Sequence, residues 1–520
     1  MSHASDLSRP GAAGAAAPIT TNSGHRGLDL EEPLIFEQDA PGRCGVDLPE
    51  PPELAGRLGG LERQAPIGLP GLTEPQVVRH FVRLSRNNFA IDAGLYPLGS
   101  CTMKHNPRLN EKLARLPGFA DLHPLQPAET VPGALQLIDE LAQWLIALTG
   151  MPAVAMSPAA GAHGELCGLM CIRAALEAAG DAREVVLVPE SAHGTNPATA
   201  AVCGYRIEEI PADGRGRVDL AALTERLDPT VAAIMLTNPN TCGLFETDIV
   251  EIAEAVHQAG AYFYCDGANF NAIVGRVRPG DLGIDCMHLN LHKTFSTPHG
   301  GGGPGSGPVV LSAALAPFAP LPMLVRGPDG PRLAEHATEA DGTAASFGRM
   351  KAFHGQMGMF VRALAYILSH GGDGLRQAAE DAVLNANYVL AELQDQMSLS
   401  FPGPCMHEVL FDDGFLKDTG VSTLDFAKAM IDEGFHPMTM YFPLVVHGAM
   451  LIEPTESESK ASIDQFIASL RHLVERAKAG DAALFAGAPY LAPRRRLDET
   501  QAARKPVLRW TPPAEEAAAE

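Results

Sequence analysis

Short apolar segments alternate with amphipathic segments through the middle of the chain. Three apolar segments, residues 184–188, 231–236 and 261–265, contain almost no polar side chains and have the length of buried strands. In residues 137–148 apolar side chains recur at every third or fourth position, which predicts an amphipathic helix that ends at Gly150. Buried strands that alternate with helices are typical of a largely parallel sheet covered on both faces. The pattern therefore predicts an α/β fold.

The same patterns predict further elements and a division into domains. Further helices are expected within residues 75–92, 166–179, 249–258, 382–397, 423–433 and 462–477, and further strands at 153–156, 287–290, 407–411 and 450–455. A chain of 520 residues exceeds the size of one hydrophobic core. We expect a large domain at residues 131–385 and a smaller α/β domain at residues 386–480. Residues 1–65 should form a partly disordered extension, residues 66–130 an arm and residues 481–520 a tail.

Composition narrows the class of protein. Hydrophobic residues make up 46% of the chain and charged residues 19%, and no apolar run is long enough to cross a bilayer. A formal net charge of −23 without a basic face argues against nucleic-acid binding. The first residues lack the charged start and apolar core of a secretory signal, so a disordered tail is expected, with a transit peptide as the alternative.

The cysteines indicate a reducing compartment. Nine cysteines are scattered without a CxxC pair, which favours reduced thiols in a cytoplasmic protein over a disulfide framework. Cys167 and Cys171 lie four residues apart on an expected helix and could share a face. No neighbouring histidine or cysteine cluster completes a metal site, so we predict that both are small core residues and that the chain binds no metal.

A lysine with amine chemistry follows one predicted strand. Lys293 lies just after residues 287–290 and is followed by four glycines, Gly300–Gly303. A lysine amine can form a Schiff base with an aldehyde cofactor, and glycines let a flat ligand approach because they lack a Cβ atom. The alternative is a surface lysine beside a flexible loop.

A carboxylate follows the preceding predicted strand. Asp266 stands directly after residues 261–265, where a charge needs a partner. In a pyridoxal-phosphate (PLP) site, such a carboxylate keeps the pyridinium nitrogen protonated, and the ring can then accept electrons from a breaking bond. The alternative is a carboxylate that caps the next turn. Ala268 and Asn269 are close enough in the chain to touch the ring or its phenolic oxygen.

Other strand ends carry candidate cofactor contacts. His193 follows residues 184–188 and is predicted to stack on the cofactor ring, with Thr195 bonding nearby, although a lone histidine is more often structural. Asn240 or Thr241 is predicted to contact the phenolic oxygen, and His292 the phosphate.

A small-residue turn at a helix start completes the set. Ala160, Gly161 and Ala162 are predicted to present backbone N–H groups to the phosphate, because a helix N-terminus favours anions. The turn lacks the GxxxxGK[ST] pattern, so it is not a nucleotide P-loop. His163 and Glu165 are either catalytic or simple first-turn residues.

Several of these segments together resemble one known family. The matching segments are RHFVRLSRNN, LYPLGSCTMKHNP, SPAAGAHGE, SAHGTNPATA, DGANFNAIVG, HLNLHKTFSTPHGGGGPG, HGAMLIEPTESESK and RRLDETQAARKPVLRW, within residues 70–510. They are similar to the P-protein of the glycine cleavage system, and in particular to its C-terminal half, which is a separate second subunit in some bacteria. FSTPHG and TNPNTCG depart from the family pattern at individual positions.

The resemblance implies a fold and a function. The implied fold is the fold-type I architecture of PLP-dependent enzymes, with Lys293 as the Schiff-base lysine, Asp266 facing the pyridine nitrogen and His193 stacked on the ring. The implied activity is decarboxylation of glycine with transfer of the aminomethyl group to the lipoyl arm of H-protein. The implied partners are a first subunit, in an α2β2 heterotetramer, and the lipoylated H-protein.

Two other interpretations remain open from the sequence. One is a different fold-type I PLP enzyme, either an amino-acid decarboxylase or a cysteine desulfurase with Cys101 or Cys242 as nucleophile. The other is a non-catalytic scaffold subunit. The presence of Lys293, Asp266 and His193 together argues against a scaffold.

Overall fold

The computed structural model describes residues 32–39, 42–46, 48–49, 52, 58–65, 67–299, 305–340, 345–352, 354, 356–494 and 496–511. Most of the expected N-terminal extension and the glycines Gly300–Gly303 lie outside the described residues. The chain divides into two compact units, which are Met1–Ala90 with Lys428–Gly434 and Asp481–Glu520, and Ile91–Ala427 with Phe435–Gly480.

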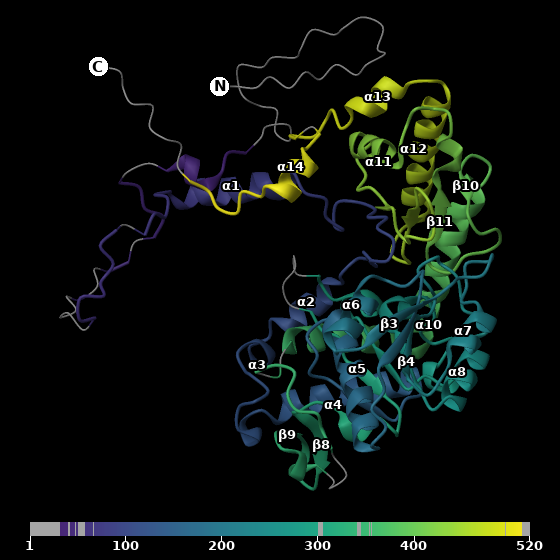
Figure 1. Cartoon of the computed structure of the whole chain (residues 1–520). Helices are drawn as coiled ribbons and strands as arrows, with labels where there is room; N and C mark the ends of the chain where they lie inside the picture. Colours follow the sequence, from purple (N-terminus) through teal and green to yellow (C-terminus); the bar gives the residue numbers. More distant parts are fainter. Residues whose placement is uncertain are drawn as a thin grey trace, which may run out of the picture. The chain divides into compact units, whose positions relative to one another are not determined.

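A seven-stranded sheet forms the centre of the larger unit (Figure 1). Its strands are β1 (Ala153–Ala155), β2 (Val185–Pro189), β3 (Arg206–Ile210), β4 (Val231–Thr237), β5 (Tyr262–Asp266), β6 (Cys286–His288) and β7 (Val309–Leu311). In space the order is β1-β7-β6-β5-β4-β2-β3. The five strands from β6 to β3 are parallel, and β7 is antiparallel to both β6 and β1. The predicted α/β fold with a largely parallel sheet is confirmed.

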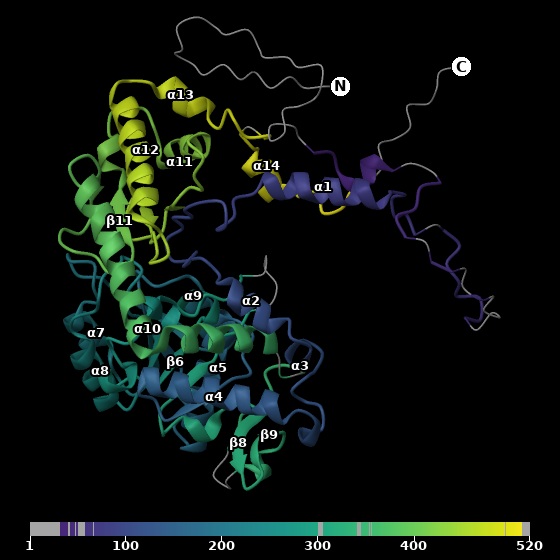
Figure 2. The ribbon, with the colours of Figure 1, turned by 180° about the vertical axis from the view of Figure 1, so that it is seen from behind.

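Helices cover both faces of this sheet. They are α4 (Pro132–Thr149), α5 (Gly161–Ala178), α6 (Thr195–Val202), α7 (Leu220–Arg226), α8 (Ile249–Gln258) and α10 (Met357–Leu393). Alternate strand residues face opposite ways, so Val186 and Val188 join the core beneath α5 and α6, whereas Val185 and Leu187 join the core beneath α4, α8 and α10. Figure 2 shows α4 and α10 lying along each other on the second face.

Local sequence explains where α4 begins and ends. Pro132 occupies its first turn, where a missing N–H costs no hydrogen bond. Gly150 follows the last turn with φ +70° and donates its N–H to the Ile146 carbonyl at 2.9 Å. Glycine adopts this left-handed conformation without a Cβ clash, so the predicted helix end is confirmed.

A second, antiparallel sheet lies in the C-terminal part of the larger unit. It contains β10 (Ser398–Leu399), β11 (Val409–Asp412), β12 (Thr439–Met440) and β13 (Met450–Ile452), in the order β10-β11-β13-β12. The helix α12 (Lys460–Lys478) begins at Ser459, whose hydroxyl accepts a hydrogen bond from the Ser462 N–H. The smaller elements of this unit are α2 (Arg108–Ala114), α3 (Pro117–Ala120), α9 (Leu291–Thr294) and the hairpin β8 (Met323–Gly327) and β9 (Gly330–Ala334). The helix α11 (Thr423–Asp432) confirms the expected helix near residues 423–433.

Among the residues that the structure describes, the smaller unit contains four complete elements and the last five residues of α11, Lys428–Asp432. The complete elements are a 3₁₀ turn (Ile35–Gln38), α1 (Glu74–Arg86), α13 (Ala482–Gly487) and α14 (Glu499–Arg504). Arg83 holds the carboxylate of Glu32 with two hydrogen bonds, and His80 lies 2.9 Å from the same carboxylate. These charge-assisted bonds tie α1 to the residues before it.

The described part of the chain has no helix that is long and apolar enough to cross a bilayer. All nine cysteines are free, and Cys167 and Cys171 are fully buried, as predicted.

Candidate active site

Three predicted site residues stand where parallel strands end. Asp266 is the last residue of β5, Lys293 lies in α9 after β6, and His193 lies between β2 and α6. Carboxyl ends of parallel strands meet at one edge of a sheet, where ligands of such folds bind. Burial has the largest influence on the pKa of both Asp266 and His193, and the charge of Lys293 also acts on both. The three side chains therefore share one site.

Lys293 is buried, with 7% of its surface exposed. Its Nζ donates a hydrogen bond to the Ser100 carbonyl at 2.8 Å. This burial excludes the alternative of a surface lysine beside a flexible loop.

Asp266 is 3% exposed and is surrounded by donors. Its Oδ2 accepts a hydrogen bond from Asn196 at 3.0 Å, and its Oδ1 accepts one from the Ala268 N–H at 2.9 Å. Burial alone would raise the pKa of Asp266, but the nearby His288 and these hydrogen bonds outweigh it and hold the pKa below its usual value. Asp266 therefore caps the following turn, as the alternative proposed, and is also an ionised carboxylate in the site.

His288 joins Asp266 to a buried tyrosine. Its Nε2 lies 3.5 Å from Asp266 Oδ1, and its Nδ1 lies 2.6 Å from the Tyr264 hydroxyl. Both His288 and Tyr264 are at most 1% exposed. Tyr264 and His288 together therefore hold the Asp266 carboxylate in one orientation.

Glu165, one of the two undecided first-turn residues, belongs to the same cluster. Asn196 donates one hydrogen bond to Glu165 at 2.8 Å and another to Asp266. Burial and then the Asp266 charge raise the pKa of Glu165 to about 8. His163 instead closes its own turn, because its Nδ1 accepts a hydrogen bond from the Ala159 N–H at 3.1 Å.

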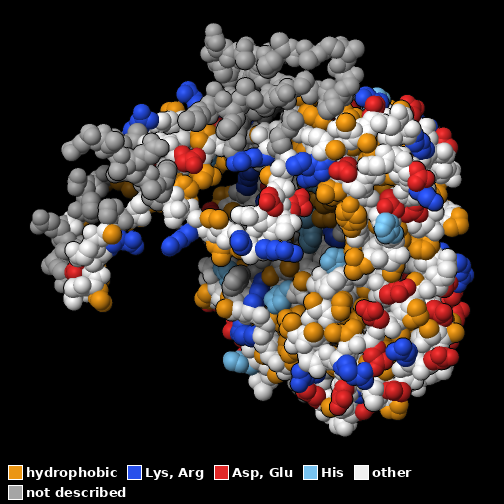
Figure 3. Space-filling model, turned by 45° about the horizontal axis from the view of Figure 1, so that its top comes forward, with side chains coloured by type: hydrophobic (Ala, Val, Ile, Leu, Met, Phe, Trp, Pro, Cys, Tyr) orange, Lys and Arg blue, Asp and Glu red, His pale blue; other side chains and the backbone are white. Residues whose placement is uncertain are grey.

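His193 is held by its neighbour in the chain. Its Nδ1 lies 2.8 Å from the Thr195 hydroxyl and accepts the Thr195 N–H at 3.2 Å. The imidazole meets the Phe442 ring edge-on, with centroids 5.5 Å apart. Thr195 therefore fixes the ring of His193, a residue that is partly desolvated but keeps part of its surface open to solvent. Several histidine side chains, pale blue in Figure 3, gather on the face of the molecule drawn there.

The predicted phosphate cradle begins α5. Ala160 is the N-cap residue, and Gly161 and Ala162 are the first two residues of this 18-residue helix. The first N–H groups of a helix have no partner inside it and carry the positive end of the helix dipole. A Cβ atom on Gly161 would lie 2.3 Å from the Asn290 side-chain oxygen, so only glycine leaves this space open.

The remaining predicted contact residues bond to protein groups. Asn240 donates to the Gly216 carbonyl and to Glu246, and its side-chain oxygen accepts two backbone N–H groups of its own loop. The Thr241 hydroxyl donates to the Ser191 carbonyl, and Asn269 donates to the Pro239 carbonyl at 3.0 Å.

His292 lies beside another histidine. Its ring centroid is 4.9 Å from that of His299, and burial lowers its pKa to about 3, with further lowering by His299. An imidazole with this pKa is neutral at physiological pH, so His292 would meet a phosphate as a neutral group.

The residues at this edge fit PLP. The site offers a buried amine for the aldehyde, an ionised carboxylate and a helix N-terminus. The Asn290 side-chain oxygen and the Ser306 hydroxyl, both near α9, are buried without a hydrogen-bond partner among the described residues. Buried polar atoms normally have partners, so these groups indicate space for a polar ligand.

Sequence reasoning missed the acidic side of the site. His407 and Glu408 precede β11, Glu453 follows β13, and all three are at most 1% exposed. Ser100 and Thr102 bind these glutamates, as described below. The sequence did contain one signal for these residues. They are the polar residues of the predicted strands 407–411 and 450–455, where a buried strand would carry apolar side chains.

Comparison with known proteins defines the class. Residues 167–302 match the family model described as aminotransferase class-V, and residues 378–484 match the one described as glycine dehydrogenase, C-terminal domain. A crystal structure of glycine decarboxylase (P-protein) of the glycine cleavage system, in inhibitor-bound form, has a TM-score of 0.67 at 23% identity, covering 81% of this chain and 93% of that chain. The protein is thus a fold-type I PLP-dependent enzyme, as predicted.

Sequence relatives define the family. A protein of Caulobacter vibrioides named "Probable glycine dehydrogenase (decarboxylating) subunit 2" is 70% identical over 518 residues, covering 99% of each chain. A protein of the same name from Desulforamulus reducens is 52% identical over 492 residues, covering 93% of this chain and 100% of that one. The chain therefore belongs to the glycine dehydrogenase (decarboxylating) subunit 2 family. This confirms the resemblance and sets aside a cysteine desulfurase.

Proposed function

We propose that this chain is the catalytic subunit of a two-subunit glycine dehydrogenase, which removes CO₂ from glycine and passes the aminomethyl group to the lipoyl arm of H-protein. The observation that supports this most is the meeting of a buried amine, Lys293, and an ionised carboxylate, Asp266, at one edge of the sheet. Bound there, PLP supplies a ring that accepts the electrons released when CO₂ leaves.

Each side chain has one task in this proposal. Lys293 would hold the cofactor through its aldehyde and would be the group that exchanges with glycine. Asp266 faces the pyridine nitrogen, and Asn196 and His288 keep its carboxylate ionised. His193 stacks on the ring in the orientation that Thr195 gives it.

Other groups hold the cofactor's substituents. Ala160, Gly161 and Ala162 bind the phosphate through backbone N–H groups, with His292 beside it. Ala268, Asn269, Asn240 and Thr241 lie at the neighbouring strand ends and shape the ring's surroundings.

The partner is a first subunit of the same enzyme, in an α2β2 heterotetramer. On α1, Val78, Phe81 and Val82 are each more than half exposed and lie at helical spacing on one face. Near the C-terminus, Val507 and Leu508 are 90% and 88% exposed. Exposed apolar faces of this kind mark protein interfaces. The nine free cysteines support a cytoplasmic location.

Borohydride reduction followed by mass spectrometry tests the cofactor bond. We expect a pyridoxyl group on Lys293 in the wild type and none in Lys293→Ala. Lys417→Ala, which removes an exposed lysine, should leave the labelled peptide unchanged. A pyridoxyl group on any other lysine would contradict the assignment.

Carbon exchange between glycine and bicarbonate tests the reaction. The assay needs both subunits, PLP and lipoylated H-protein. We expect exchange in the wild type and its loss in Lys293→Ala. A folded, PLP-loaded wild-type complex without exchange would refute the proposed function.

A further inference from the structure

Three buried titratable side chains meet beside Lys293. His407, Glu408 and Glu453 each offer a ligand atom within 4.8 Å of the others, and none is more than 1% exposed. His407 and Glu408 directly precede β11, and Glu453 directly follows β13. None of them has a task in the proposed function.

The polar atoms of this cluster are incompletely bonded. Both ring nitrogens of His407, one carboxylate oxygen of Glu408 and one of Glu453 are buried without a hydrogen-bond partner among the described residues. His407 Nε2 lies 3.9 Å from Glu453 Oε1, which is too long for a hydrogen bond. Burial of two ionised carboxylates with oxygens within 4.8 Å of each other is very unfavourable, so a proton or a cation must compensate one charge.

The cluster is linked to Lys293 through one residue. The Ser100 N–H donates to Glu408 Oε2 at 2.7 Å, while the Ser100 carbonyl accepts the Lys293 amine at 2.8 Å. Ser100 has φ +59°, a left-handed conformation that turns its N–H and carbonyl to these two partners. Two residues further, the Thr102 hydroxyl donates to Glu453 at 2.6 Å.

The titratable groups around the pair lie on several elements. Lys293 acts from α9 and Glu456 from the loop after β13, while His407 directly precedes Glu408 and β11, and Cys101 lies between Ser100 and Thr102. Burial lowers the pKa of His407 to about 3, with a smaller contribution from Lys293, so this imidazole is neutral and brings no positive charge. Asn271 adds a neutral donor to Glu453 at 3.2 Å.

We propose that Glu408 and Glu453 share one proton and act as a positioning pair that keeps a single negative charge beside Lys293. This inference rests on the proposed function, in which Lys293 alternates between a bonded and a free amine. The free amine becomes a cation in a buried site, and the singly charged pair stabilises that cation.

The titration of the two acids agrees with this arrangement. Burial and then Glu453 raise the pKa of Glu408 well above its usual value, and burial raises that of Glu453 to about 7. Glu408 therefore holds the proton more tightly, and Glu453 carries the charge above neutral pH. Two interacting carboxyls titrate as a pair rather than separately.

Infrared difference spectroscopy of the cofactor-free protein is the first test. Slightly above neutral pH we expect the C=O band of a protonated carboxyl in the wild type. Glu408→Gln should lose it because the proton carrier is gone. In Glu453→Gln the band should weaken, because Glu408 loses the charged neighbour that raises its pKa, while burial, the larger cause, remains. Glu251→Gln, on the exposed side of α8, should retain it. Glu165, whose pKa is raised to about 8, contributes its own C=O band in every variant. The readout is therefore the loss of C=O intensity relative to the wild type, and unchanged intensity in both cluster variants would overturn the proposal.

Competitive acetylation of Lys293, read by mass spectrometry at fixed pH, is the second test. Glu408→Gln retains the negative charge of Glu453, so the labelling rate should stay within about twofold of the wild type. The double variant Glu408→Gln with Glu453→Gln loses that charge, so we expect Lys293 to label about tenfold faster. An unchanged rate in the double variant would overturn the proposal.

A third measurement distinguishes a shared proton from a bound metal cation as the positive charge in the cluster. Elemental analysis of purified protein should find no stoichiometric divalent metal that the double variant lacks. Such a metal, held by one imidazole and two carboxylates, would overturn the shared proton. If the double variant does not fold, the infrared bands of the single variants still decide. None of these readouts needs glycine turnover, so failure of the proposed reaction would show separately in the exchange assay.

Discussion

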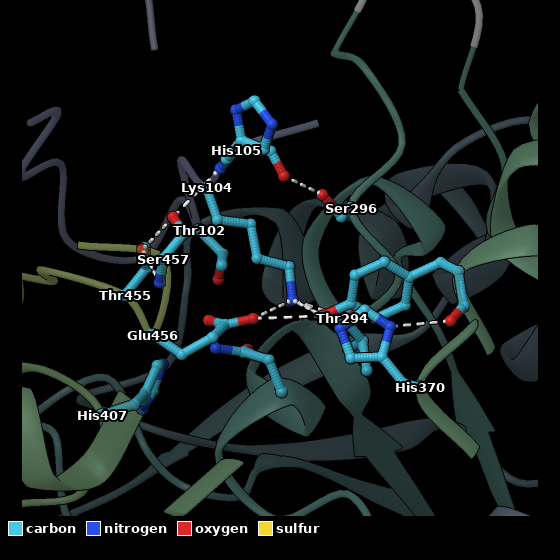
Figure 4. A network of polar contacts seen from close by, with 12 residues as sticks. Thr102, Lys104, His105, Thr294, Ser296, His370, His407, Thr455, Glu456 and Ser457 are labelled. Atoms are coloured by element: carbon cyan, nitrogen blue, oxygen red, sulfur yellow. Dashed lines mark hydrogen bonds and ion pairs between the residues drawn. The ribbon is translucent and has the colours of Figure 1, made fainter. Parts of the chain in front are cut away.

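Lys104 Nζ lies 2.6 Å from Glu456 Oε1, and this pair fixes the turn that carries Lys293. Lys104 is 5% exposed and also donates to the Thr294 carbonyl at 2.9 Å and to the Tyr366 hydroxyl at 3.2 Å. Figure 4 shows the Lys104 amine between Glu456 and Thr294. Thr294 directly follows Lys293, so the buried ammonium holds the backbone of the reactive lysine. All three donors of Lys104 are used, so it has none left for glycine.

Replacement of Lys104 by methionine should therefore weaken both the fold and the site. The variant leaves Glu456 without its cation and releases the Thr294 carbonyl, so we expect a loss of about 3 kcal/mol of unfolding free energy. Denaturant unfolding measures this loss, and borohydride trapping should show less pyridoxyl on Lys293.

The double variant Lys104→Met with Glu456→Gln is the matched control. It removes the stranded charge, so we expect it to regain part of the stability but not the trapped cofactor. Equal trapping in the double variant and the wild type would mean that the Thr294 contact does not position Lys293.

The variant Asp266→Asn should show whether the negative charge of Asp266, rather than the size of its side chain, is needed for activity. The amide keeps the size of the side chain but removes the negative charge that, in the proposed function, faces the pyridine nitrogen. We expect glycine–bicarbonate exchange to fall by at least about a hundredfold, as for other preorganised electrostatic groups. Asp285→Asn is a suitable control, because Asp285 is also buried and accepts the Phe263 N–H at 2.8 Å outside the site. Equal losses in the two variants would point to folding rather than chemistry.

Local patterns predicted five of the seven strands of the large sheet, all except β3 and β7, and the strand-end residues of the site. Residues 184–188, 231–236 and 261–265 could be identified because a strand buried on both faces needs a continuous apolar run. Asp266 and Lys293 could be identified because a polar side chain directly after such a strand lies at the ligand edge. Both signals are local in the sequence.

The contacts of Glu408 and Glu453 could not be predicted from the sequence, because their partners lie far away in the chain. Ser100 and Glu408 are separated by 308 positions, and Thr102 and Glu453 by 351. Their contact depends on how an irregular segment packs against the second sheet, which neither helical nor strand periodicity encodes. The same limit applies to Lys104, since its partner Glu456 is 352 positions away.

Glu246 should make the stability of the cofactor-free protein depend on pH. This carboxyl is 2% exposed, and burial raises its pKa from 4.5 to about 7 despite hydrogen bonds from Asn240 and the Val218 N–H. An acid with a raised folded-state pKa stabilises the fold fully below the unfolded value and loses that contribution as pH rises through the folded value. Between pH 4.5 and 7 the unfolding free energy should fall by roughly 3 kcal/mol through this group. Unfolding in denaturant at a series of pH values should show a flatter profile for Glu246→Gln, and parallel profiles would contradict the assignment.

Gly267→Ala should disrupt the contact between β5 and β6 that brings Asp266 and Lys293 together. A Cβ atom on Gly267 would lie 1.9 Å from the His288 carbonyl oxygen, which is backbone and cannot move aside as a side chain could, and 2.7 Å from the end of the Met287 side chain. Overpacking of this kind costs about 3 kcal/mol and separates the two strand ends, so thermal unfolding should occur at a lower temperature and borohydride trapping on Lys293 should fall. Gly118→Ala provides the control, because its Cβ would meet no atom within 4 Å and α3 tolerates alanine. If Gly267→Ala matched the stability and trapping of Gly118→Ala, the spacing of β5 and β6 would not determine the geometry of the site.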